Sequence, residues 1–69
     1  MAFVKLYERV VSYDAEGKPV MYVEGTHLDG DTLPTENIAQ GSLSMDLTNK
    51  EMDTFDGTQW GTLFAFPST

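Results

Sequence analysis

The pattern that decides the fold lies in residues 42–57, SLSMDLTNKEMDTFDG. Apolar and polar residues alternate through its first seven positions, with Leu43, Met45 and Leu47 on one side and Ser42, Ser44, Asp46 and Thr48 on the other. A period of two is typical of a strand that is buried on one face. Residues 48–51 then supply a turn, residues 52–55 a returning strand, and Asp56-Gly57 a turn of the kind favoured in hairpins. The pattern therefore predicts consecutive antiparallel hairpins.

The N-terminal segment, residues 2–13, is open to two interpretations. Its content of Val, Tyr and Phe favours a strand, but its apolar residues also fall at helical spacing: Phe3, Leu6, Tyr7, Val10 and Val11. The next residues, DAEGKP at 14–19, carry the Asp and Gly of a hairpin turn, so we expect a strand there and its return at 20–24. Gly25 would mark either a bulge or the strand end.

Two further segments complete the predicted domain. Residues 28–41 are rich in Asp, Gly, Pro and Asn and read as a long connector. Residues 59–66 read as a last strand, in which alternation places Trp60, Phe64 and Phe66 on one face with Thr58 and Thr62, and Pro67 ends it. We therefore predict a mostly β single domain over residues 1–69. It has about five short antiparallel strands in consecutive hairpins (2–24 and 42–66) and a long central loop at 28–41.

Composition limits how so small a domain can be stabilised. A chain of 69 residues buries only roughly 60% of its unfolded surface. It contains no cysteine and a single histidine, which excludes disulfides and thiolate metal sites, and a multi-histidine zinc site would need a second chain. Self-association or docking on a partner remains, and the candidate packing or interface residues are aromatic: Phe3, Tyr7, Trp60, Phe64 and Phe66.

The charge distribution narrows the choice of partner. The net charge is -7, and residues 21–69 hold Lys50 alone against eight acids. Direct binding to nucleic acid needs clustered Lys and Arg, so we expect none, whereas a basic protein partner remains open. No apolar run approaches the roughly 18 residues that cross a bilayer, and no leader pattern is present, so we expect no membrane partner and a protein kept inside the cell.

Candidate chemistry is sparse. Asp29-Gly30-Asp31 has carboxylates around a glycine, but the remaining ligands of a calcium loop are missing, so we interpret it as a turn. His27 has only the Thr26 hydroxyl beside it and is expected to be a surface or partly packed histidine. We therefore predict a non-enzymatic protein without catalytic residues, cofactor or metal.

A sequence resemblance in the second half of the chain implies a biological context for the protein. Residues 41–50, GSLSMDLTNK, followed by Phe55-Asp56 and Trp60 and preceded by GDTLPT at 30–35 and NIA at 37–39, resemble a pattern in small proteins of tailed bacteriophages and prophages. The chain departs from that pattern at Asn49-Lys50 and at Thr54. The resemblance implies a virion accessory subunit, made in the bacterial host cytoplasm, that decorates the head or a head fibre or sits at the tail or connector. Its implied partner is the major capsid protein or a tail or connector protein.

Two functional hypotheses follow. The first is a structural interaction protein, oligomeric, that adds the edge of strand 2–13 to a neighbour. The second is a small acidic inhibitor that mimics nucleic acid and occupies the basic groove of a host enzyme, although turns interrupt its acids. An unspecified binding module is the remaining possibility. Salt sensitivity separates the hypotheses, because only binding by charge weakens at high salt.

Overall fold

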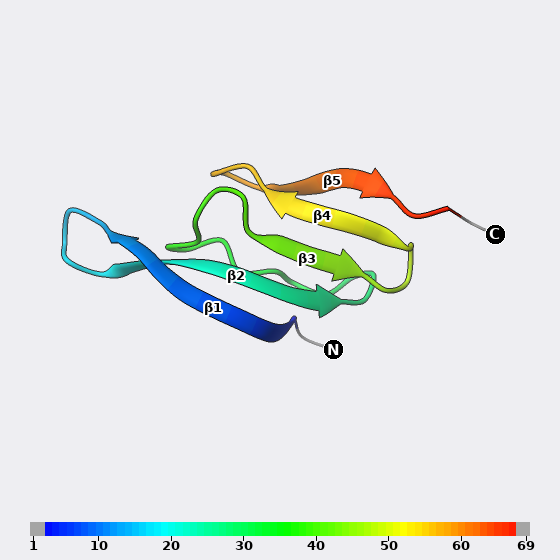
Figure 1. The fold of residues 1–69 in the computed structure, drawn as a ribbon, viewed down its shortest axis with the longest axis horizontal. Helices are drawn as coiled ribbons and strands as arrows, with labels where there is room; N and C mark the ends of the chain where they lie inside the picture. Colours follow the sequence, from blue (N-terminus) through cyan, green and yellow to red (C-terminus); the bar gives the residue numbers. More distant parts are fainter. Residues whose placement is uncertain (1–2, 68–69) are drawn as a thin grey trace.

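The computed structural model describes residues 3–67 as a single five-stranded sheet (Figure 1). Its strands lie side by side in chain order: β1 (Val4–Tyr13), β2 (Pro19–His27), β3 (Leu43–Asp46), β4 (Glu51–Phe55) and β5 (Trp60–Ala65). No helix occurs in this part of the chain, which confirms the mostly β prediction and excludes the helical alternative for the N-terminal segment. The expected strand start at Ala2 lies outside the described residues.

The β2 and β3 strands pair in parallel, so the prediction of consecutive antiparallel hairpins is wrong at this one junction. The other three neighbouring pairs are antiparallel as expected. A parallel pair needs a connection of a dozen or more residues to carry the chain back to the starting end of the sheet. Residues 28–41 supply that length. They were expected to join two hairpins, and instead they form the crossover.

The crossover is tied to the sheet at two points. Ile38 forms an isolated parallel bridge with Met21, because the Met21 amide donates to the Asn37 carbonyl at 2.8 Å and the Ala39 amide to the Met21 carbonyl at 2.7 Å. Further back along the crossover, the Trp60 indole Nε1 donates to the Pro34 carbonyl at 2.7 Å. We call the face under residues 28–41 the covered face, and the opposite one the open face.

The covered face is mostly polar where it is buried. Val23 and Phe55 are its buried apolar side chains, each 2% exposed. The other buried side chains belong to Ser42, Ser44, Asp46 and His27. In the alternating segment 42–48, the side that carries the polar residues is therefore the buried side of the strand. Leu43 and Met45 lie on the open face and are only half-buried.

Close backbone approach explains Gly25. The β2 strand runs on through Gly25 to His27, two residues past the glycine and three past the predicted strand end. The bulge lies on the opposite strand, where the pairing shifts between Lys5 and Tyr7. A Cβ on Gly25 would fall 2.2 Å from the Val4 carbonyl oxygen, so only glycine fits here.

A second irregularity changes which face the C-terminal aromatics share. Trp60 pairs with Phe55 on the covered face, but a register shift places Phe64 opposite Met52. Neighbouring positions of β4 point to opposite faces, and Met52 is on the open one. Phe64 is therefore also on the open face, and the prediction that Trp60 and Phe64 share a face is wrong because simple alternation ignores bulges.

Candidate functional site

The five candidate aromatic residues divide into three groups rather than forming one platform. Trp60 packs against Phe55 and Phe3, with ring centroids 5.5 and 6.5 Å away, and fastens the crossover through its bond to Pro34. Tyr7 packs edge-on against Tyr22 at 6.3 Å, and Phe64 against Phe66 at 5.3 Å. Trp60 and Phe3 thus stabilise the fold, whereas Tyr7 and Phe64 remain about half exposed.

The open face carries a band of apolar side chains across all five strands. The cross-strand pairs place these residues on it: Val4, Tyr7, Tyr22, Leu43, Met45, Met52 and Phe64. Leu6, at the β1 bulge, joins them in lining a shallow hollow with Leu43, Met45 and Met52. Leu6 is 70% exposed, which is extreme for a leucine within a strand.

Two polar side chains within this face, those of Tyr22 and Glu24, are paired with each other. The Tyr22 hydroxyl donates to the Glu24 carboxylate at 2.6 Å, and this bond to a carboxylate raises the pKa of Tyr22 above its usual value. Because Glu24 already accepts a hydrogen bond from a neighbour, the band can be covered without leaving that carboxylate unpaired.

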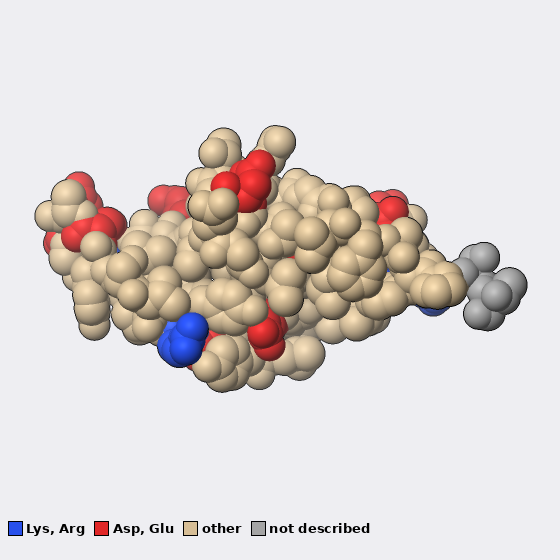
Figure 2. Space-filling view, turned by 45° about the horizontal axis from the view of Figure 1, so that its top comes forward, with Lys and Arg blue, Asp and Glu red and all other residues tan. Residues whose placement is uncertain are grey.

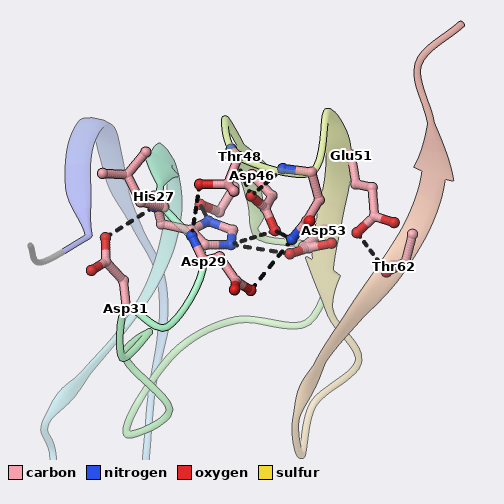
Figure 3. Close-up of polar contacts among 11 residues, drawn as sticks. His27, Asp29, Asp31, Asp46, Thr48, Glu51, Asp53 and Thr62 are labelled. Atoms are coloured by element: carbon pink, nitrogen blue, oxygen red, sulfur yellow. Dashed lines mark hydrogen bonds and ion pairs between the residues drawn. The ribbon is translucent and has the colours of Figure 1, made fainter. Parts of the chain in front are cut away.

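The second candidate region is a buried polar cluster on the covered face, at the carboxyl ends of β2 and β3. Parallel pairing sets His27 beside Asp46, and Asp53 projects from the neighbouring β4 strand. The His27 Nδ1 lies 2.6 Å from the Ser44 Oγ, and its Nε2 lies 3.2 Å from Asp53 Oδ2 and 3.8 Å from Asp46 Oδ2. Figure 3 shows the imidazole directed at the two carboxylates. We call His27, Ser44, Asp46 and Asp53 the histidine cluster.

Asp46 is fixed in place by the turn that follows it. Its carboxylate accepts hydrogen bonds from the backbone amides of Asn49 and Thr48 and from the Asn49 side chain at 2.8 Å. These bonds hold the pKa of Asp46 below its ordinary value, and the bond from the Asn49 backbone amide contributes most. The carboxylate is therefore ionised at neutral pH and presents a rigid negative charge to His27.

The cluster contains the residue types of a nucleophilic triad, but its geometry does not suit catalysis. Ser44 is 0% exposed, so its hydroxyl cannot contact a substrate. Its hydroxyl is also paired with Nδ1, and the two carboxylates face Nε2. The arrangement gives no reason to assign a hydrolytic reaction.

Sequence reasoning missed this cluster. His27 was expected at the surface or partly packed, but it is 7% exposed and buried. One signal was present: Ser44 and Asp46 share a side of the alternating pattern. The sequence did not predict the parallel pairing that brings His27 alongside them. The neighbouring Asp29-Gly30-Asp31 forms a turn, with the Leu28 amide donating to the Asp31 carboxylate at 2.9 Å.

Comparison with known proteins adds no relative. No family model, no curated protein and no solved structure matches this chain. The described part of the chain also has no helix long and apolar enough to cross a membrane. The resemblance to phage proteins accordingly stays a prediction.

Proposed function

We propose that this protein is a non-enzymatic interaction subunit that packs its open face against a larger protein. The proposal rests on the small number of buried apolar side chains compared with those that are exposed. Within residues 3–67, two apolar side chains form the buried core, whereas Val4, Leu6, Tyr7 and Phe64 on the open face are each between 47% and 70% exposed. Contiguous apolar surface on a small domain marks an interaction site, and covering it would supply the stability that so thin a core lacks.

The edge of the sheet offers a second means of attachment. β1 is an edge strand of ten residues, and it pairs with β2 along one side only. Its outer backbone amides and carbonyls are therefore available to another strand, which would extend the sheet. Val4 and Tyr7 lie on the open face of this strand, so strand addition and face packing would engage one continuous surface.

The setting proposed for this subunit is the virion of a tailed bacteriophage, on the strength of the sequence resemblance. A major capsid, tail or connector protein would then be the partner, with self-association of the subunit beside it. An accessory subunit that gains stability on docking agrees with the exposed apolar band and the thin core.

The alternative, an acidic inhibitor of a nucleic-acid enzyme, needs acids displayed along one continuous face. In the view of Figure 2 the acidic side chains stand in separate groups divided by uncharged surface. The face seen in this view therefore offers the inhibitor no continuous acidic surface.

A pair of charge substitutions on β1 tests the use of the open face. Leu6→Glu places a charge in the open-face hollow, and we expect it to abolish self-association or capture by particles. Val10→Glu is the matched control, because Val10 is also exposed on β1 but pairs with Met21 toward the covered face. Sedimentation analysis of the purified variants would measure the difference. Equal loss in both variants, or in neither, contradicts a role for the open face.

Quantitative mass spectrometry of gradient-purified particles tests the setting. A fixed multi-copy ratio of this chain to a capsid or tail protein is expected for a virion subunit. Recovery from the soluble lysate alone would contradict the virion assignment, while leaving the open-face result above to be judged on its own.

A further inference from the structure

Three side chains with metal-binding atoms converge in the histidine cluster from three different strands. One ligand atom from each of His27, Asp46 and Asp53 lies within 4.8 Å of the other two. The side chains are 6%, 7% and 13% exposed, so the convergence is buried rather than a chance meeting of surface acids. Each ligand is placed by a regular strand, which gives the site a rigid frame.

The second observation is a missing partner. Asp53 Oδ1 is buried, and within residues 3–67 it has no hydrogen-bond partner. A buried carboxylate oxygen without a donor is costly, and a cation bound to this carboxylate would offset that cost. The lysine ion pairs in the described part of the chain involve Glu8 and Glu16 and so do not neutralise the cluster. Within residues 3–67, no lysine or arginine forms an ion pair with the carboxylates of the cluster.

The third observation concerns the orientation of the imidazole. Ser44 holds Nδ1 at 2.6 Å, which leaves Nε2 directed at the carboxylates. Metal-binding histidines almost always have their other ring nitrogen fixed in this way, and the Asn49 bonds to Asp46 fix a carboxylate ligand similarly. The cluster thus has both the ligands and the groups that orient them.

We infer that His27 Nε2, Asp46 and Asp53 bind one divalent transition-metal ion, with zinc as the best match. Zinc takes imidazole and carboxylate ligands at about 2.0–2.1 Å in tetrahedral geometry, which sets ligand atoms about 3.3–3.4 Å apart. The distances from Nε2, 3.2 and 3.8 Å, already lie near that value. Three protein ligands leave the fourth position to water. The site lies on the covered face, so it is separate from the proposed docking surface.

Nitrogen NMR gives a direct test, because His27 is the only histidine in the chain. One equivalent of zinc added to the 15N-labelled protein is expected to shift the Nε2 resonance strongly while Nδ1 keeps its proton. Imidazole resonances that stay unchanged in excess zinc overturn the inference, whatever any variant does.

Thermal unfolding with zinc locates the site. Zinc at about 100 times its dissociation constant should raise the melting temperature of the unsubstituted protein by roughly 10 °C or more. Asp53→Asn should lose most of this rise. Glu36→Gln, which removes one negative charge from the crossover outside the cluster, should keep it. An equal rise in all three proteins places zinc elsewhere and overturns the assignment. Should Asp53→Asn fail to fold, the NMR result on the unsubstituted protein decides.

Discussion

At the scale of single residues, the most consequential side chain is Trp60. It joins three parts of the molecule: Phe55 on the adjacent strand, Phe3 near the N-terminus and the Pro34 carbonyl of the crossover. Its ring supplies apolar contact and its Nε1 satisfies a backbone acceptor, the usual combination for a buried or half-buried tryptophan. Because residues 3–67 bury only two apolar side chains, one such contact represents a large share of the apolar packing there.

Truncation of this side chain should therefore be severe. We expect Trp60→Ala to lower the free energy of unfolding by about 3 kcal/mol, the lower end of the range for large aromatics because Trp60 is only half-buried. Phe64→Ala is the control: Phe64 is 47% exposed, and its loss should cost much less. Urea unfolding followed by circular dichroism measures both. Equal effects would contradict the assignment of Trp60 to the core and Phe64 to the open face.

At the scale of elements, the tightest constraint is the contact between β1 and β2. Gly25 allows Val4 to approach it, and the Phe3 ring lies against the same position. Gly61 occupies a similar place within β5, but a Cβ there would meet nothing within 4 Å. The two glycines thus share a secondary structure and differ in the space around them.

This difference predicts opposite tolerance to alanine. Gly25→Ala should lower the free energy of unfolding by about 3 kcal/mol or more, because backbone must move to admit the methyl group. Gly61→Ala should be neutral or slightly stabilising, since alanine restricts the unfolded chain. Thermal melts of the two variants would show the contrast. A Gly25→Ala protein as stable as Gly61→Ala would mean that β1 is not held against β2 at this point.

The turns are fixed by aspartates whose pKa values are lowered. The Asp56 carboxylate accepts hydrogen bonds from the Gln59 and Thr58 amides at 2.8 and 2.7 Å, and these bonds hold its pKa below the ordinary 3.8. The pKa of Asp14 is lowered in the same way, and the hydrogen bond from the Asn37 side chain contributes most. A carboxyl whose pKa is lower in the folded than in the unfolded state stabilises the fold at any pH above its unfolded-state pKa. This contribution is lost as the pH falls through the folded-state pKa.

We therefore expect stability to decline as pH falls from about 5 to below 3.8, and Asp56→Asn to flatten part of this decline. Glu36→Gln removes the same charge from the crossover, outside the Asp56 turn, and controls for net charge. Urea midpoints measured across this range test the linkage. A decline equally steep in Asp56→Asn and in the unsubstituted protein would remove the Asp56 turn from the explanation.

At the scale of the whole molecule, the sheet is a single layer with one face covered. Its extents are 46 × 22 × 18 Å, so it resembles a slab more than a sphere. The crossover covers the face that bears Val23, Phe55 and the histidine cluster, and the apolar band on the opposite face remains open. A second layer is the usual way to bury such a band.

That arrangement predicts stability that depends on association. If copies pack through the open face, the melting temperature should rise with protein concentration. The association should also persist at 1 M salt, where charge interactions are screened. Differential scanning calorimetry over a wide concentration range measures the first effect and sedimentation the second. A concentration-independent melting temperature would restrict the open face to a different partner, and self-association lost at high salt would contradict apolar packing of the open face.

The sequence by itself determined the local structure. Alternation at residues 42–48, the Asp and Gly turn residues and the β-rich N-terminal segment predicted strands close to β1, β3, β4 and β5, because these signals act within a few residues. It also determined that the fold would bury few apolar residues, because length and composition limit the size of the core.

Only the tertiary structure decided how these strands combine. The return of residues 28–41 made β2 and β3 parallel, covered the side bearing Ser44 and Asp46, and buried His27 between two carboxylates. The bulge in β5 moved Phe64 to the open face. Alternation separates the two faces of a strand, but which face is covered depends on where a distant segment packs, and no pattern within the strand carries that information.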